Sequence, residues 1–354
     1  MTTLNRRMLL ASSAGLITQA ACATSPRYMI ADVWVTGESG QGTAASLEEA
    51  FAVARLSNGA PFVVGLMPGA YEEKRILDAP NTTIMGSGPD SVITFGAAAG
   101  HTRPNGERWG TSGSATLTID APGVTLRNLT VRNSFDYLED RITGASGGAQ
   151  AVALAVGREA DRTLIENCRV EGYQDTLLLQ ARTYMRDCVV TGCVDFIFGG
   201  AAAYLDRCTI INRAVPGRTD GFIAAPSTPE LQPHGFVFSN CRLEREPGVP
   251  DGTIHLGRPW RAGGNMSLLG AAAFIDCWMD AHIAREGWTS MGYRGPDGDA
   301  RQLTPEEARL FERGSTGPGA GQPSTRRRML SPAIAAAMTP ENVLGGWRPT
   351  MGGR

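Results

Sequence analysis

Five of the seven cysteines recur at one phase of a repeat of about 20 residues, and no other feature constrains the fold of this chain as strongly. The first three are separated by 20 and 20 residues, and the next gaps of 33 and 36 residues fit the same unit with loop insertions. Each cysteine follows polar residues and opens a short run typical of a β-strand. The five segments are "ENCRV" (Cys168), "RDCVV" (Cys188), "DRCTI" (Cys208), "SNCRL" (Cys241) and "IDCWM" (Cys277).

Such a period, with short β-branched runs and glycine turns, is typical of a solenoid of strands. Each turn of chain stacks on the previous one, and equivalent strands build parallel sheets. Two earlier segments, "NTTIMGSG" and "GVTLRNLTVRN", each fit one coil. We therefore predict an all-β solenoid. The alternative is that three cysteines are equally spaced by chance.

Cysteines at one phase of stacked coils would form an inward ladder of small apolar side chains. Stacked Cα atoms lie within the range that a disulfide spans, so two alternatives stay open at this point: a bridge between Cys188 and Cys208, or stacked free thiols. The chain has no CxxC pair and no cluster of cysteine with histidine, which disfavours a zinc site.

The composition is that of a globular chain. Of 354 residues, 42% are hydrophobic and 19% are charged, which excludes an intrinsically disordered protein. The net charge is −2 and no long basic block occurs, so a nucleic-acid partner is not expected. The 44 glycines favour a turn-rich β architecture over a helical bundle.

The first 23 residues are expected to be an export signal that is removed. Arg6 and Arg7 precede an apolar stretch too short to span a bilayer, and "ACA" supplies small residues for cleavage. The paired arginines favour a twin-arginine signal over an ordinary secretory one. We therefore predict an exported protein, periplasmic or extracellular. An outer-membrane lipoprotein anchored at Cys22 is less favoured, because Gln19 is a poor residue three positions before it.

Two aspartates lie among apolar and aromatic neighbours, where a carboxylate is normally unfavourable. Asp175 and Asp195 are 20 residues apart, which is one predicted coil. Neighbouring parallel strands lie about 4.8 Å apart, so the two carboxyl groups would face the same way at roughly that separation. One acid would keep its proton, and the other would stay charged if a cation supports it. The alternative is two turn aspartates that accept backbone hydrogen bonds; Asp187, in the polar pair "RD", is expected at the surface.

Five short segments, in order, resemble the signatures of the pectin methylesterases (pectinesterases), in particular the bacterial members. The likeness extends over roughly residues 30–347. It implies a right-handed parallel β-helix with short helical segments at the ends, formed by residues 27–354 as a single catalytic domain. The segments are "GAYEE" (69–73), "QAVAL" (150–154), "GYQDTL" (172–177), "DFIFG" (195–199) and "LGRPW" (256–260).

The resemblance also implies catalytic roles. Asp195 looks like a nucleophile that forms an acyl-enzyme, and Asp175 looks like a general acid that then acts as a base. Gln150 and Gln174 look like amide donors to the oxyanion. Arg258 would hold Asp195 ionised and oriented through a charge-assisted contact.

Four further residues look like substrate contacts by the same resemblance. Trp260 and Phe198 offer flat rings to the C–H faces of a sugar, with core packing as the alternative for each. Thr116 and Met291 are expected to line the cleft. Glu73, in the first signature, is expected to cap or pair within the N-terminal coils.

The implied function is that of a carboxylic-ester hydrolase that demethylates methyl-esterified homogalacturonan (pectin) and releases methanol. The resemblance implies no metal or organic cofactor, no obligate protein partner and a monomer. The alternatives are an esterase or thioesterase of other substrates on the same scaffold, and a non-catalytic polysaccharide-binding β-helix. A lyase with acid-held calcium is disfavoured, because only Asp297–Asp299 approaches an acidic cluster. "GASGG" around Ser146 matches a serine-hydrolase elbow, but its flanks predict a glycine-rich loop.

Three local predictions complete the sequence analysis. Residues 304–314, "TPEEARLFERG", are expected to form a short helix capped by Thr304. The basic run Arg326–Arg328 is expected to be a solvated face. Residues 97–111 and 133–148 flank signatures and are expected to be loops near the cleft.

Overall fold

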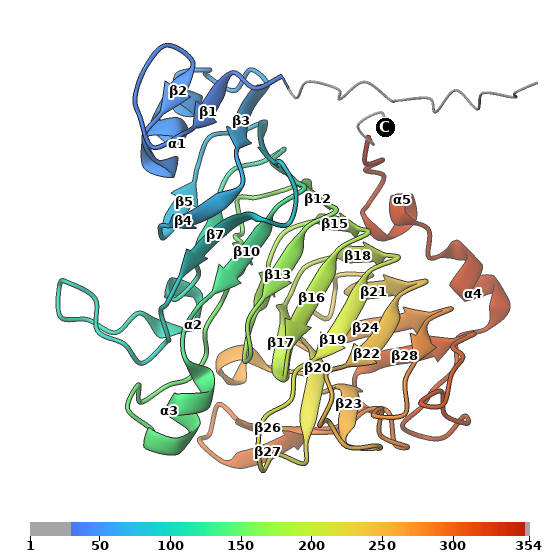
Figure 1. The fold of residues 1–354 in the computed structure, drawn as a ribbon. Helices are drawn as coiled ribbons and strands as arrows, with labels where there is room; N and C mark the ends of the chain where they lie inside the picture. The colour runs from blue at the N-terminus through green and yellow to red at the C-terminus, as the bar shows by residue number, and fades with distance from the viewer. Residues whose placement is uncertain (1–29, 351–354) are drawn as a thin grey trace, which may run out of the picture. The chain divides into compact units, whose positions relative to one another are not determined.

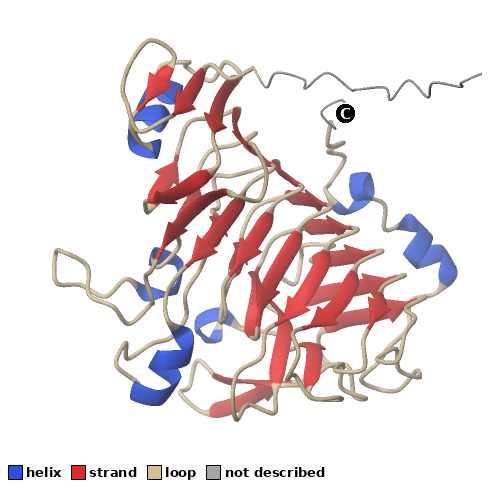
Figure 2. Cartoon of the chain, in the orientation of Figure 1, coloured by secondary structure: helices blue, strands red, loops and turns tan. Residues whose placement is uncertain are grey.

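Three parallel β-sheets organise residues 30–350, the part of the chain that the computed structural model describes (Figure 1; Figure 2). The first sheet contains β2 (Thr43–Ala44), β1 (Val33–Val35), β3 (Phe62–Leu66), β6 (Thr82–Gly86), β9 (Thr125–Arg127), β12 (Thr163–Glu166), β15 (Thr183–Arg186), β18 (Ala203–Asp206), β21 (Phe236–Ser239), β24 (Ala271–Ile275) and β28 (Arg309–Arg313), in that order. The second contains β25 (Trp278–Met279), β22 (Arg242–Arg245), β19 (Thr209–Asn212), β16 (Val189–Gly192), β13 (Arg169–Glu171), β10 (Thr130–Asn133), β7 (Ser91–Phe95) and β4 (Gly69–Glu72). The third contains β23 (Ile254–Gly257), β20 (Gly221–Pro226), β17 (Val194–Gly199), β14 (Leu177–Leu179), β11 (Leu154–Val156), β8 (Leu117–Ile119) and β5 (Arg75–Leu77).

The chain visits the three sheets in turn, so that β12, β13 and β14 form one coil and β15, β16 and β17 form the next. Thr163 pairs with Thr183, and Thr183 pairs with Ala203, each 20 residues further along the chain. Ala203 then pairs with Phe236, and Phe236 with Ala272, at the longer spacings of the cysteine pattern. The prediction of a parallel β-helix is confirmed.

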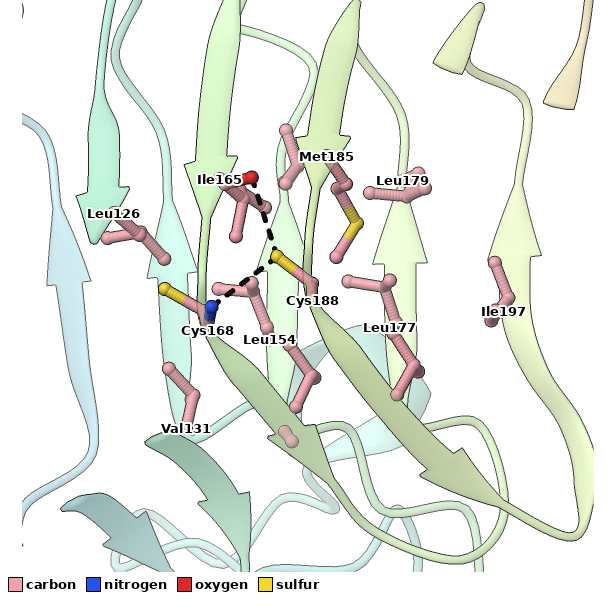
Figure 3. Close-up of a cluster of buried hydrophobic side chains, with 14 of the residues drawn as sticks. Leu126, Val131, Leu154, Ile165, Cys168, Leu177, Leu179, Met185, Cys188 and Ile197 are labelled. Carbon is pink, nitrogen blue, oxygen red and sulfur yellow. Dashed lines mark hydrogen bonds between the residues drawn. The ribbon is translucent and has the colours of Figure 1, made fainter. Parts of the chain in front are cut away.

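The cysteine ladder lies inside the coils. Each of its five members is at most 1% exposed. Figure 3 shows Cys168 and Cys188 on neighbouring coils among leucine, isoleucine and valine side chains. All five are free thiols, so the Cys188–Cys208 bridge is not formed. Instead the thiol of Cys188 donates to the carbonyl of Arg186 at 3.2 Å, and that of Cys208 to the carbonyl of Asp206 at 3.5 Å. The members are Cys168, Cys188, Cys208, Cys241 and Cys277.

The residue before each cysteine has a left-handed backbone conformation. The φ angles there lie between 50° and 53°, a region that asparagine and aspartate tolerate better than most residues. This corner turns the chain from the first sheet into the second, and it explains why a polar residue precedes each cysteine in the sequence. The corner residues are Asn167, Asp187, Arg207, Asn240 and Asp276, and Asn128 takes the same position before Leu129 in an earlier coil.

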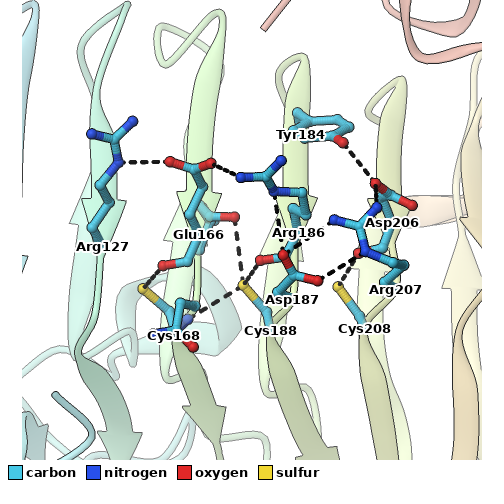
Figure 4. A network of polar contacts seen from close by, with 12 residues as sticks. Arg127, Glu166, Cys168, Tyr184, Arg186, Asp187, Cys188, Asp206, Arg207 and Cys208 are labelled. Carbon is cyan, nitrogen blue, oxygen red and sulfur yellow. Dashed lines mark hydrogen bonds and ion pairs between the residues drawn. The ribbon is translucent and has the colours of Figure 1, made fainter. Parts of the chain in front are cut away.

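A row of alternating charges crosses the outside of the same coils (Figure 4). Glu166 accepts from Arg127 at 2.6 Å and from Arg186 at 2.9 Å. Arg207 pairs with Asp187 at 3.0 Å, and Asp187 is at the surface as predicted, with 44% of its side chain exposed. Each exposed pair contributes at most about 1 kcal/mol. Because the pairs join residues about one or two coils apart in sequence, they also favour one register of stacking.

Short helices lie towards both ends of the coil, as predicted. The helix α1 (Leu47–Arg55) buries Leu47 and Phe51 against the first coils. Its N-cap is Ser46, and Glu73 accepts from the backbone N–H of Leu47 at 2.9 Å, which confirms the capping role expected for that acid. The helices α4 (Pro332–Ala337) and α5 (Pro340–Val343) lie near the C-terminus.

The two insertions are more ordered than predicted. The first leads into α2 (Gly110–Gly113), and the second contains α3 (Tyr137–Thr143) rather than a loop alone. Tyr137 of α3 stacks on Tyr173 with ring centroids 5.1 Å apart, which fixes this helix beside the "GYQDTL" coil. The alternating apolar contacts of a short amphipathic helix were hidden there by flanking glycines.

The helix predicted over residues 304–314 is wrong. Its first part is a turn in which Glu307 accepts from the N–H of Thr304 at 2.9 Å, as a helix cap would. The remainder is strand β28, which pairs with β24 and buries Leu310. The free edge of the first sheet therefore outweighs the local helix signal.

The predicted solvation of the basic run Arg326–Arg328 is also wrong at its centre. The side chain of Arg327 is 1% exposed and pairs with Glu312, itself 2% exposed, at 2.6 Å. The guanidinium also donates to the carbonyls of Ala284 and Gly319. This pair fastens the C-terminal segment to the last coils.

Among residues 30–350, none of the helices has the length and apolar character needed for a bilayer span. The predicted export signal and the alternative anchor at Cys22 lie outside the described residues.

Candidate active site

Asp175 and Asp195 lie at equivalent positions of successive coils. The pairs Gln174–Val194 and Leu177–Ile197 flank them in register, 20 residues apart on each side. Asp175 has φ of 60° and Asp195 has φ of 47°. Both side chains line one cleft on the outer face of the third sheet, so the alternative of two unrelated turn aspartates is wrong.

A β-bulge places Asp195. Between Val194 and Ile197 the pairing of β17 with β20 shifts register, so that one extra residue stands on β17. Bulges re-aim side chains and are common beside active sites. Gly199 ends the strand at φ of 121°, where a Cβ atom would come 2.1 Å from the carbonyl oxygen of Leu179. The bulge and this glycine together explain why "DFIFG" stands as one unit in the sequence.

Arg258 holds Asp195 through two parallel hydrogen bonds. Nε donates to Oδ1 at 2.9 Å, and Nη2 donates to Oδ2 at 2.7 Å. The arginine follows β23, and Gly257 before it lets the chain approach β20, since a Cβ atom there would be 2.3 Å from the carbonyl oxygen of Ala224. Paired N–H bonds of this kind orient a carboxylate and favour its charged form.

The two carboxyl groups differ in their support. Burial raises the pKa of Asp175 well above its ordinary value; the nearby Asp195 adds to this rise, and Arg258 opposes it. Burial also raises the pKa of Asp195, but the hydrogen bonds and charge of Arg258 oppose that rise, with a smaller contribution from Arg218. Because only Asp195 receives N–H bonds from Arg258, it ionises first, and Asp175 keeps its proton.

Two glutamines face the same cleft. Gln150 precedes β11 and Gln174 precedes β14, and both line the cavity beside the aspartates. Within residues 30–350 neither side-chain amide makes a hydrogen bond, although neighbouring glutamine Gln232 makes two. Amide donors directed into a partly enclosed site can bind an oxyanion.

An apolar wall closes one side of the cleft, whose volume is about 380 Å³. Phe198 and Trp260 lie 6.1 Å apart with their rings tilted by 55°. Phe198 is buried at 3% exposure and packs with the apolar face of the sheet, whereas Trp260 is partly exposed. Met291 also lines the cleft. The remaining lining residues, which the sequence analysis did not single out, are Thr111, Ser112, Leu178, Gln180 and Ala225.

Thr116 does not line the cleft, and its predicted contact with substrate is wrong. Its side chain is fully buried, and its hydroxyl donates to the carbonyls of Arg132 at 2.9 Å and Phe95 at 3.2 Å. The residue just before β8 points inwards, and Thr111 and Ser112 of α2 face the cleft instead.

Other reactive side chains do not converge on this cleft. Ser146 is buried in the turn after α3, so the strand-turn-helix of a serine-hydrolase elbow is not formed. Over residues 30–350 no group of three or more His, Cys, Asp or Glu side chains is arranged to hold a metal ion.

Comparison with known proteins agrees with this geometry. The family model described as Pectinesterase matches residues 32–325. Pectinesterase A of Dickeya chrysanthemi is 34% identical over 311 residues, which covers 82% of this chain and 84% of that protein. The chain belongs to the pectinesterase family. A pectinesterase is a carboxylic-ester hydrolase, so the family assigns the class of reaction.

Solved pectin methylesterases share the fold. The enzyme from Yersinia enterocolitica has a TM-score of 0.81 at 35% identity, covering 86% of this chain and 99% of that one. A pectin methylesterase in complex with hexasaccharide VII has a TM-score of 0.85 at 33% identity, covering 92% and 100%. The match therefore extends over the coils that carry the two aspartates.

Proposed function

We propose that this chain demethylates pectin, with Asp195 as the nucleophile and Asp175 as the proton donor. The observation that carries the proposal is the pairing of a protonated acid with an arginine-held carboxylate on adjacent coils of one cleft. Membership of the pectinesterase family supports the substrate class, and the relative bound to a hexasaccharide supports a polymer of sugars.

The reaction follows from the positions of these groups. An oxygen of Asp195 attacks the ester carbonyl carbon, and the amides of Gln150 and Gln174 donate to the developing oxyanion. As the C–O bond to the methoxy group breaks, Asp175 gives its proton to the leaving oxygen, and methanol departs. The acyl-enzyme remains on Asp195. Asp175, now a carboxylate, takes a proton from water as that water attacks the acyl carbon, which frees the polymer carboxylate.

Arg258 keeps the nucleophile charged and oriented throughout these steps. We propose that Trp260 and Met291 contact the sugar, since both are accessible from the cleft, and that Phe198 supports Trp260 from beneath. The flat apolar surface suits the C–H face of a pyranose ring, and the uncharged methyl ester suits the apolar wall.

The setting of the enzyme is part of the proposal. Residues 27–354 form one catalytic domain that acts as a monomer in the periplasm or outside the cell, after removal of a signal over residues 1–23. A polymer substrate too large to enter the cell requires such a location. Signal cleavage is checked by mass spectrometry of the protein recovered from the producing cell.

The deciding experiment is methanol release from highly methylated pectin by the purified protein. We expect release by the wild-type chain, with or without EDTA. Hydrolysis of simple thioesters or esters without action on pectin would favour the alternative esterase, and binding of pectin without methanol release would favour the non-catalytic β-helix.

A further inference from the structure

Arg258 has one contact that its role as a carboxylate partner does not require. One face of its guanidinium lies over the ring of Phe222, with Cζ 3.8 Å from the ring centroid. The edge of the same group makes the two bonds to Asp195. The guanidinium is therefore fixed in two directions, in its plane by the carboxylate and across its plane by the aromatic ring.

The position of Phe222 follows from the order of strands in the third sheet. Arg258 follows β23, Asp195 is on β17, and β20 lies between those two strands. The arginine side chain must cross β20 to reach its partner. Phe222 is the β20 residue that pairs with Val194, the residue immediately before Asp195. The ring thus lies beneath the path of the arginine.

His255 supports the ring from the next coil. It pairs directly with Phe222 across β20 and β23, and the two rings stack with centroids 5.7 Å apart and planes 11° apart. Burial lowers the pKa of His255, and the charges of Arg326 and Arg258 also lower it, while Glu286 and Asp220 oppose them. A neutral imidazole behind the ring adds no repulsion to Arg258.

We propose that Phe222, supported by His255, is a positioning residue that holds the guanidinium of Arg258 flat against Asp195. This inference rests on the proposed function of Asp195. An arginine has several rotatable bonds, and an aromatic face that restricts them reduces the entropy lost when both hydrogen bonds form. The ring also excludes water from one face of the ion pair, which strengthens its attraction.

Loss of the ring has a specific consequence. The charged groups facing Asp195 are Arg258, Arg218 and, when ionised, Asp175. When Arg258 is less well held, the pKa of Asp195 rises, because the main interaction that opposes burial weakens. The nucleophile is then protonated at a higher pH, so the acid limb of the kcat profile moves to higher pH. Substrate does not contact Phe222, so KM changes little.

The test compares Phe222→Leu with Phe236→Leu. Phe236 is fully buried on β21 and touches no cleft residue, so its variant matches the loss of a buried ring. We expect kcat to fall about tenfold or more in Phe222→Leu at unchanged KM, with the acid limb moved to higher pH. Phe222→Tyr should restore both. Equal behaviour of the two leucine variants, or an unmoved acid limb in Phe222→Leu, overturns the proposal.

A double-mutant cycle with Arg258→Lys separates positioning from general stability. Lysine keeps a charge but loses the planar pair of bonds, so Phe222→Leu should cost little further activity in that background. Additive losses overturn the proposal. If Phe222→Leu does not fold, His255→Leu is the second variant, and it should move the acid limb in the same direction by less.

A readout without substrate distinguishes this inference from the proposed function. Carboxyl ¹³C shifts of labelled aspartate, with Asp195 assigned by Asp195→Asn, report the pKa of Asp195 directly. We expect that pKa to be higher in Phe222→Leu than in the wild type and unchanged in Phe236→Leu. An inactive wild type would overturn the function alone, whereas an unchanged pKa of Asp195 would overturn the positioning role alone.

Discussion

Asp175 lies one coil before Asp195, and both have a left-handed backbone, with φ of 60° and 47°. Non-glycine residues in this region carry strain of about 1–3 kcal/mol when the surroundings do not relieve it. Both carboxyl groups are also held out of bulk water. The stacked coils therefore retain two unfavourable features at one place, and the chemistry of ester hydrolysis supplies a reason for retaining them.

Replacing either aspartate by alanine should abolish methanol release. In Asp195→Ala no acyl-enzyme forms, and in Asp175→Ala the leaving methoxide receives no proton. We expect losses of at least about a thousandfold, while far-ultraviolet circular dichroism stays that of the wild type. Asp187→Ala, at an exposed corner two coils from Asp175's strand ends, is the matched control and should stay active. Retained turnover in Asp175→Ala or Asp195→Ala removes the role assigned to that residue.

Asp175→Asn should be inactive and yet more stable than the wild type at neutral pH. The folded-state pKa of Asp175 is raised above its unfolded value of about 3.9, so the folded chain holds the proton more tightly. Its contribution to stability is fully present below the unfolded pKa and is lost as the pH rises towards the folded pKa. Asparagine removes this loss.

The measurement is the melting temperature of both proteins from pH 4 to pH 8. The gain in Asp175→Asn should grow with pH and vanish near about pH 4, where the wild-type acid is protonated in both states. Asp187→Asn, which removes an exposed carboxylate paired with Arg207, should show no such gain. A gain that is independent of pH would mean that proton binding by Asp175 is not its cause.

The fold and the catalytic pair could be predicted from the sequence because both depend on one period. Each coil contributes the same small set of contacts to the next, so the spacing between Cys168 and Cys188 states the register directly, and the same spacing brings Asp175 over Asp195. A repeat makes long-range contacts readable as local ones.

Features that depend on a particular neighbour were not predictable in this way. Strand β28 overrides the cap signal at Thr304 because the edge of β24 is free to pair. Arg327 is buried because Glu312 is waiting for it, and neither residue alone marks the pair. The side chain of Thr116 and that of Ser112 stand four residues apart, and only the path of α2 decides which one reaches the cleft.

Glu312→Gln should destabilise the C-terminal coils strongly. The variant leaves the guanidinium of Arg327 buried without a matching negative charge, and breaking such a pair costs about 3–5 kcal/mol. The measurement is the free energy of unfolding in urea. Glu306→Gln is the control, since its contact with Arg326 is exposed at 3.7 Å, and it should cost less than about 1 kcal/mol. Similar losses in the two variants would contradict a special contribution from the buried pair.

Lys74, the single lysine of the chain, supports the wall of the cleft from behind. Its ammonium lies 4.6 Å from the centroid of the Trp109 ring and donates to the carbonyl of Ala115 at 2.6 Å. Trp109 immediately precedes α2, which carries Thr111 and Ser112 to the cleft. We expect Lys74→Met to raise KM for pectin several-fold with little change in kcat, because the wall shifts while the aspartates do not.

The same side chain predicts a pH dependence of substrate binding. Burial, with a contribution from the charge of Arg103, lowers the pKa of Lys74 to about 8. The ammonium is charged below this pH and loses its proton above it, so KM of the wild type should rise as the pH passes about 8. In Lys74→Met that rise should be absent, whereas the surface variant Arg55→Met should keep it. A KM in Lys74→Met that equals the wild-type value at pH 7 would show that α2 holds the wall without help from Lys74.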